Sequence, residues 1–251
     1  MRPELKRIFA ASRRRRLLEV EESTSDDYFA NVQLLLDADG SDGSTTLSDL
    51  SPNDSTVSFD TNAELDTADK KFGTASILVD NTAGTAVSVP VADGLNTLNL
   101  TDGFTVEAFI KGTTLAGTIA SSWTWATQTG RSWWWGAGAD GLLAIYLQED
   151  PAGGDNWSTV PGVISTGTWH HTVFQVQPAG NMEMFVDGSQ VMDQAPTGVS
   201  ALKVPTVDFC VGATSDSNDV WDGWIDSVRV TAGVARYTDG YDVPTAAFPT
   251  S

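Results

Sequence analysis

The chain has few of the residues that build disulfide scaffolds, metal centres and histidine-based active sites. Its single cysteine, Cys210, excludes an internal disulfide framework and lies in an apolar alternation at residues 207–211 that is typical of a buried side chain. Its only histidines, His170 and His171, are adjacent, and neighbouring side chains on a strand point to opposite faces. They therefore cannot chelate one metal ion together or serve one substrate as an acid–base pair.

Long apolar runs are also missing. The longest uncharged stretch, residues 112–130, is rich in Thr and Ser, whose polar groups would be left unsatisfied in lipid. The basic N-terminus leads into Leu17-Leu-Glu-Val20 instead of an apolar segment with a cleavage site, so we expect no export signal. The sequence thus predicts no membrane partner and synthesis in the cytoplasm.

Basic residues are scarce overall but concentrated at one end. The chain has 14 Lys and Arg against 33 Asp and Glu, yet residues 1–16 carry +6, which leaves −25 on the remainder of a chain whose net charge is −19. We interpret residues 1–22 as a helical or extended arm and 23–31 as a linker; a disordered tail is the alternative. Such an arm can anchor on an acidic protein surface, whereas the acidic body repels nucleic acid and anionic membranes. The predicted anchoring residues are Arg2, Lys6, Arg7, Arg13, Arg14, Arg15 and Arg16.

From residue 32 onward, short apolar runs alternate with turns rich in Gly, Asp and Pro. This spacing is typical of a β-sandwich, and it predicts one all-β domain over residues 32–251. The twelve predicted strands are 32–36, 57–59, 75–79, 86–89, 104–111, 119–124, 131–136, 142–148, 169–177, 182–186, 207–212 and 225–230.

Several motifs occur in an order that is similar to that of one known family. They are the blocks 34–43 and 63–76, Gly103-Phe-Thr-Val-Glu-Ala-Phe109, Gly167-Thr-Trp-His-His171, Met184-Phe-Val-Asp-Gly188, and Gly223-Trp-Ile-Asp-Ser-Val-Arg-Val-Thr-Ala-Gly-Val-Ala-Arg-Tyr237. Together they resemble laminin-G-like, concanavalin A-like jelly-roll domains, especially those of tailed-bacteriophage virion proteins. Phe109 stands where the family often has Trp. We expect Arg236 and Tyr237 to seal the last strand and the tail against the domain.

The resemblance implies a surface-binding protein that is not an enzyme. It suggests a virion structural protein of the capsid-decoration or head-fibre type, synthesised in the host cytoplasm, homo-oligomeric, and anchored by its arm to another virion protein. A tail-associated receptor-binding adhesin is the alternative. A glycoside hydrolase is a weaker one, because the nearest set of carboxylates, Glu64, Asp66 and Asp69, is followed at once by Lys70 and Lys71 and lacks the composition of a strand that lines a cleft.

Tryptophan supplies the candidate ligand contacts. On a strand, Trp133 and Trp135 share one face and Trp134 takes the other, so exposed members would form a stacking platform for the sugar rings of host-surface glycans. The alternative is that most of these rings fill the core or a subunit interface. The predicted ligand-binding residues are Trp123, Trp125, Trp133, Trp135 and Trp157.

Two acidic loops are candidate calcium sites. Asp37, Asp39 and Asp42 lie in the first turn, and Asp216 and Asp219 precede the last strand. Carboxylate oxygens are the ligands that Ca²⁺ prefers. Neither loop has a spacing specific to a metal site, so a solvated acidic surface is an equal alternative, and no other cofactor is expected.

Overall fold

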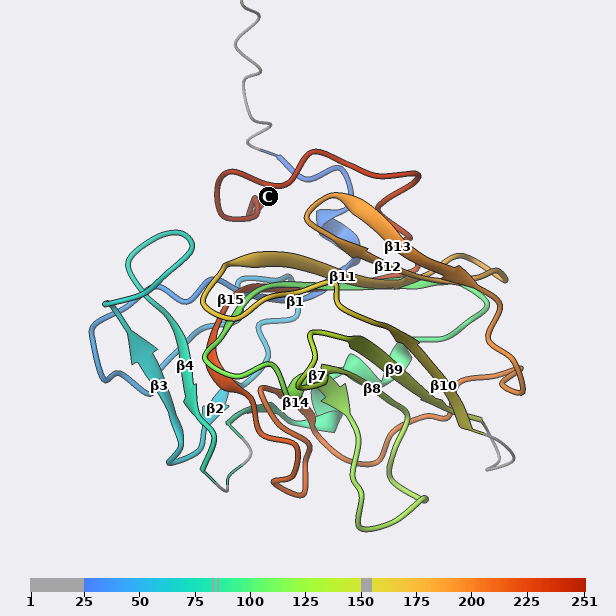
Figure 1. The fold of residues 1–251 in the computed structure, drawn as a ribbon, viewed down its shortest axis with the longest axis horizontal. Helices are drawn as coiled ribbons and strands as arrows, with labels where there is room; N and C mark the ends of the chain where they lie inside the picture. The colour runs from blue at the N-terminus through green and yellow to red at the C-terminus, as the bar shows by residue number, and fades with distance from the viewer. Residues whose placement is uncertain (1–24, 83, 85, 150–154) are drawn as a thin grey trace, which may run out of the picture.

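The fold is a sandwich of two antiparallel β-sheets (Figure 1). The computed structural model describes residues 25–82, 84, 86–149 and 155–251. The predicted anchoring residues of the arm lie outside this range. Over the described residues the architecture confirms the predicted all-β jelly-roll sandwich.

The upper sheet in Figure 1 has eight strands. Their spatial order is β13 (Ser189–Gln194), β12 (Met182–Val186), β11 (His170–Val176), β6 (Phe104–Gly112), β15 (Asp222–Ala232), β4 (Ser76–Asp80) and β3 (Ala63–Asp66), with β1 (Val32–Leu36) also paired to β15.

The lower sheet has seven strands. Among the described residues, three short 3₁₀-helices lie at Phe29–Asn31, before β1, and at Val91–Asp93 and Leu95–Thr97, between β5 and β6. The strand order is β10 (Asp155–Val160), β9 (Leu143–Gln148), β8 (Trp133–Ala137), β7 (Gly117–Ser122), β14 (Phe209–Val211), β5 (Val87–Val89) and β2 (Ser58–Phe59).

All twelve predicted strands overlap observed ones, and the three strands that were not predicted, β3, β10 and β13, are all edge strands. An edge strand has one neighbour and a partly solvated surface, so its composition is less apolar than that of a central strand. The interpretation of residues 64–69 as lacking strand character was therefore wrong for its first half, because Glu64 and Asp66 lie on β3.

The long strand β15 organises the upper sheet. It pairs with β6 on one side; on the other it pairs with β4 through its first half and with β1 through its second half. A bulge after Asp226 separates the halves, and Ser227 adopts a positive φ of 48° there. Such a bulge bends the strand and changes its twist, which lets one strand exchange partners along its length.

The core lies between the two sheets. Phe104, Val106 and Ile110 of β6 point into it from the upper sheet, and Trp133 and Trp135 of β8 point into it from the lower sheet. The Phe104 and Trp133 ring centroids lie 6.4 Å apart, so the sheets meet through aromatic contacts. Burying each large apolar side chain contributes about 1.5–3 kcal/mol.

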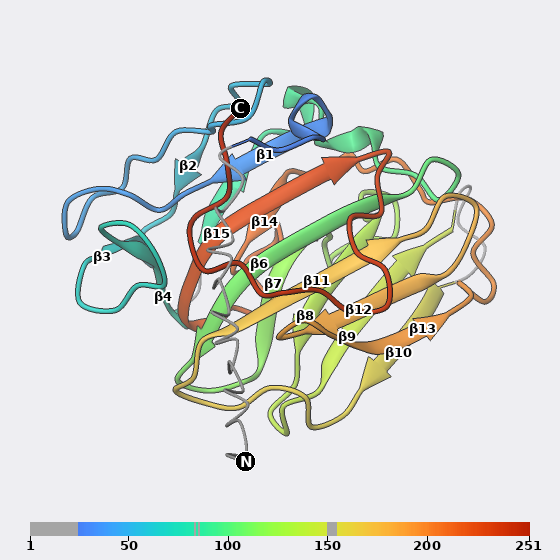
Figure 2. The same cartoon turned by 90° about the horizontal axis from the view of Figure 1, so that it is seen from above.

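The outer faces of the two sheets differ. The C-terminal segment, residues 233–251, crosses the upper sheet from outside (Figure 2), and Phe248 packs there against Phe109 and Leu35. Beneath the lower sheet, the loop between β7 and β8 extends away from the sandwich (Figure 1). No helix within the described ranges is long and apolar enough to span a bilayer.

Candidate functional site

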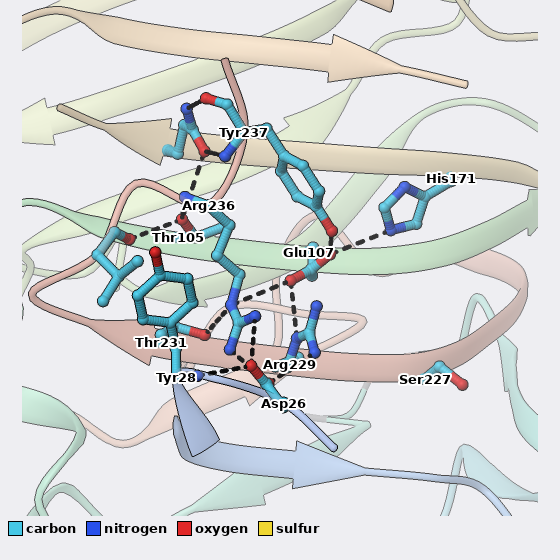
Figure 3. A network of polar contacts seen from close by, with 12 residues as sticks. Asp26, Tyr28, Thr105, Glu107, His171, Ser227, Arg229, Thr231, Arg236 and Tyr237 are labelled. Carbon is cyan, nitrogen blue, oxygen red and sulfur yellow. Dashed lines mark hydrogen bonds and ion pairs between the residues drawn. The ribbon is translucent and has the colours of Figure 1, made fainter. Parts of the chain in front are cut away.

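A buried polar network joins the upper sheet to the C-terminal segment (Figure 3). Glu107 on β6 is fully buried and accepts hydrogen bonds from Arg229 Nε at 2.8 Å and from the Tyr237 hydroxyl at 2.5 Å. Burial opposes ionisation of Glu107, but the Arg229 guanidinium, His171 and Arg236 outweigh it and hold the pKa of Glu107 well below its usual range.

Asp26 extends this network to the N-terminal end of the described chain. Its carboxylate lies 2.7 Å from Arg236 Nη2 and 3.1 Å from Arg229 Nη1. Arg236 and Tyr237 therefore seal the C-terminal segment against the sheet, as expected from the closing motif. These groups are engaged with one another beneath the segment, and Asp26, Arg229 and Arg236 also line a hollow of about 300 Å³ beside it.

A second polar cluster has the distances of a catalytic triad. Ser165 Oγ lies 3.0 Å from His170 Nε2, and His170 Nδ1 lies 2.7 Å from Asp187 Oδ2. The backbone N–H of Ser165 also donates to the same Nε2 at 3.1 Å, however. That contact competes with the hydroxyl for one lone pair and removes an N–H group that could stabilise an oxyanion. The arrangement is better suited to fixing the turn that leads into β11.

The carboxylates of the weaker hydrolase alternative are held by structural partners. Asp66 accepts a hydrogen bond from Trp224 Nε1 at 2.7 Å. Asp69 accepts one from Trp169 Nε1 at 3.0 Å and forms an ion pair with Lys111. Each of these two carboxylates is therefore held by protein partners, with Asp66 at the end of the edge strand β3.

The outer face of the lower sheet carries an aromatic cluster. Trp123, Trp134 and Ala144 form its buried part, with Tyr146 packed against them. The Trp123 and Tyr146 centroids are 5.4 Å apart, and the Arg131 guanidinium lies 4.5 Å from the Trp123 ring centre. Trp134 Nε1 donates to Thr118 Oγ1 at 2.8 Å, so its polar edge is satisfied within the sheet.

Trp125 is the exposed member of this surface, and it is fixed from several directions. The residue is 40% exposed. It meets Trp123 and Tyr146 edge-on, with centroid distances of 5.4 and 5.6 Å. Its Nε1 donates to Asp219 Oδ2 at 2.7 Å, and its backbone N–H donates to Asp216 Oδ2 at 2.9 Å. The result is a flat apolar ring held in one orientation at the protein surface.

The predicted set of ligand-binding tryptophans needs correction. Trp123, Trp133 and Trp135 are at most 1% exposed, so these rings cannot stack on a ligand from solvent. Trp133 and Trp135 fill the core because their face of β8 points inward. Trp125 remains a candidate, and the side chain of Trp157 lies outside the described part of the structure.

Trp134, Tyr146 and Arg131 build the surface around Trp125 and were not among the predicted ligand-binding residues. The pairing of β8 with β9 could have identified this surface. Trp134 is opposite Tyr146 in that pair, whereas Trp135 is opposite Ile145. The inward face of β9 carries Leu143, Ile145 and Leu147. A predicted hairpin of β8 with β9 would therefore have placed Trp134 on the outer face.

The predicted calcium ligands are each in contact with protein groups. Asp37 interacts with Ser227, Asp39 with Thr74, and Asp42 with Thr67. In the second loop, Asp216 and Asp219 bind the N–H groups of Trp125. In the ranges that the structure describes, no group of three or more His, Cys, Asp or Glu side chains could hold a metal ion. The carboxylates instead hold loops through protein donors.

A family model described as the concanavalin A-like lectin/glucanase superfamily matches residues 81–235, which is more than half of the chain. The chain belongs to this superfamily. No curated protein matches it.

Solved structures show the same superfamily fold at low sequence identity. The botulinum neurotoxin serotype D binding domain is 15% identical with a TM-score of 0.62, covering 85% of this chain and 50% of its own. The binding domain of Paraclostridial Mosquitocidal Protein 1 is 11% identical with a TM-score of 0.60, covering 83% and 50%. This chain thus spans half the length of these toxin domains.

A smaller domain gives a more complete superposition. Domain 4 of AbnA, an extracellular arabinanase of Geobacillus stearothermophilus solved in complex with arabinotriose, is 18% identical with a TM-score of 0.55. The match covers 82% of this chain and 94% of that domain. At these identities the likeness shows the fold.

Proposed function

We propose that this domain is a non-enzymatic binding module that holds a glycan against Trp125 on the outer side of the seven-stranded sheet. The observation that carries the proposal is a tryptophan that is 40% exposed and fixed by two aromatic neighbours and two carboxylates. Stacking on a fixed ring needs little ordering of the protein, so the contact is pre-organised. The arabinanase domain with its bound arabinotriose supports sugar binding as a use of this fold.

The proposal that the domain is not an enzyme is supported by the protein contacts of its acidic and histidine side chains. Ser165 shares one histidine nitrogen with its own backbone N–H, and Asp66 and Asp69 are bound to indole nitrogens. A single exposed ring gives weak affinity, and repeated copies of the domain would convert weak binding into avidity.

Replacing Trp125 with alanine is expected to weaken glycan binding about tenfold or more, because the stacking surface is removed. The measurement is binding to an array of neutral and acidic oligosaccharides, followed by titration of the best ligand. Leu50→Ala is the matched control, since Leu50 is also 40% exposed and is a large apolar residue elsewhere on the domain. Equal binding by the wild type and the Trp125 variant would remove the basis of the proposal.

We propose further that the protein is a virion component, with its basic arm docked on an acidic partner and the domain displayed outside. The support is the resemblance of the motif order and the separation of charge, +6 on residues 1–16 against −25 on the rest. A receptor-binding role at a phage tail is the alternative. Imaging of intact particles would distinguish the two roles, because it shows whether the chain lies on the capsid or on the tail.

Deleting residues 2–16 is expected to abolish incorporation into particles while leaving a folded domain. Co-sedimentation with particles measures incorporation, and thermal unfolding measures the fold. Changing the seven basic residues to Gln at constant length should reproduce the loss, because charge is the proposed attraction. Normal incorporation of both variants would rule out arm-mediated anchoring.

A further inference from the structure

A polar hollow lies at the loop end of the sandwich, on the same loop that fixes Trp125. It has a volume of about 380 Å³ and is lined by residues 81–82, 114, 116–117 and 217–220. That volume lies in the usual range for small-ligand sites, roughly 300–1,000 Å³. Its side chains are mostly Asn, Thr and Ser, which suit a ligand covered with hydroxyl groups.

We propose that this polar hollow is the subsite that selects neutral sugars over acidic ones, a proposal that rests on glycan binding at Trp125. Asp219 connects the two features, because it lines the hollow and accepts the Trp125 Nε1 hydrogen bond at 2.7 Å. A chain of sugars stacked on Trp125 therefore has a hydrogen-bonding surface beside it.

Hydrogen bonds within the 214–218 loop hold one wall of the polar hollow, and some polar groups of the described lining have no protein partner. Ser217 N–H donates to Thr214 O, and Asn218 N–H donates to Thr214 Oγ1, which closes the loop. Ser217 and Asp219 have positive φ values of 62° and 47°. Among the described residues, the Asn81 amide, the Thr114 hydroxyl and the Ser217 hydroxyl have no protein hydrogen-bond partner and are available to a ligand.

The charges around the polar hollow disfavour an anionic ligand. Among the residues that the structure describes, no Lys, Arg or His lines it, whereas Asp219 does, and Asp216 lies on the same loop. Asp80, which accepts hydrogen bonds from Thr82 of the lining, adds a further carboxylate nearby. A uronic or sialic acid would meet like charges here without a compensating cation, while a neutral sugar meets donors and acceptors.

Two variants test the polar hollow without disturbing Trp125. Thr114→Val removes one hydroxyl at nearly constant shape, and Ser217→Gly removes the other at a position whose left-handed backbone favours glycine. The probes are neutral gluco-, galacto-, arabino- and xylo-oligosaccharides together with glucurono- and galacturono-oligosaccharides of the same lengths. We expect the wild type to bind only the neutral probes. The double variant should bind them about fivefold more weakly, with an unchanged melting temperature.

A third variant, Thr114→Lys, adds a cation and should shift the preference toward the acidic probes about tenfold.

The outcomes separate this inference from the proposed function. If Trp125→Ala abolishes binding while the double variant binds normally, the polar hollow is not a subsite although Trp125 still binds glycan. Preference of the wild type for acidic probes, or loss of binding in a chelator, would overturn selection by uncharged hydroxyl contacts. Absence of binding to every probe at millimolar concentration would reject both.

Discussion

Replacing Glu107 with alanine is expected to lower the free energy of unfolding by about 3–5 kcal/mol, the usual consequence of removing one partner from a buried ion pair. Glu107 is fully buried and is the shared partner of Arg229, Tyr237 and His171. Its loss leaves the Arg229 guanidinium, itself largely buried, with Asp26 alone. The C-terminal segment also loses its bond through the Tyr237 hydroxyl, so the effect spreads beyond β6.

Urea unfolding followed by intrinsic fluorescence measures this loss, and a melting temperature lower by roughly 10 °C should accompany it. Glu64→Ala on β3 is the matched control, because Glu64 is exposed and its removal should change stability by less than about 0.5 kcal/mol. Glu107→Gln keeps the volume and isolates the contribution of the charge. A loss below about 1 kcal/mol for Glu107→Ala would mean that the network does not hold the tail to the sheet.

The domain is expected to become more stable as the pH is lowered from 7.5 to 5. Burial raises the pKa of Asp37 and of Asp226 to about 6 in each case, and the nearby Asp226 carboxylate also raises the pKa of Asp37. In the unfolded chain these groups have a pKa near 3.9. The folded state therefore binds more protons between about pH 4 and 6, and stability falls as the pH rises through that window.

The expected gain is about 1 kcal/mol for each carboxyl between pH 7.5 and 5, or roughly 2 kcal/mol for the pair. Below about pH 4 we expect stability to fall as the pH falls. The Arg229 guanidinium outweighs burial and lowers the pKa of Glu107, so the unfolded chain takes up this proton first. Stability from such a group is lost as the pH falls, so the maximum should lie near pH 4–5.

Urea unfolding at a series of pH values gives the profile. Asp37→Asn keeps the acceptor for the Ser227 hydroxyl and removes one of the two charges, so it should flatten the profile by at least half. Asp140→Asn, at an exposed turn, is the matched control and should leave the slope unchanged. Stability that rises steadily from pH 5 to 7.5 in the wild type would contradict the assignment.

The central strands could be predicted from the sequence because they have partners on both sides. Residues 104–112 and 222–232 form β6 and β15, whose apolar and alternating patterns follow from contact with the core and the tail. The edge strands β3, β10 and β13 carry weaker patterns because solvent replaces one neighbour. The closing motif also indicated the roles of Arg236 and Tyr237, which the network confirms.

The candidate site was harder to predict for two physical reasons. Alternation along β8 shows that Trp134 points to the opposite face from Trp133 and Trp135, but it does not show which face is buried. The pairing with β9 decides that. The fixed orientation of Trp125 depends on Asp216 and Asp219, about ninety residues later in the chain. Contacts of such sequence separation leave no local pattern that identifies them.

The backbone N–H of Asp26 donates to the carbonyl of Ser251 at 2.8 Å, so the described chain enters and leaves the sandwich at one point. Figure 1 places that point above the upper sheet and the loop between β7 and β8 below the lower one. A domain with adjoining ends can be inserted into a surface loop of a host protein without stretching it. A carrier protein joined at the Asp26–Ser251 contact would therefore leave the loop between β7 and β8 on the far side of the sandwich.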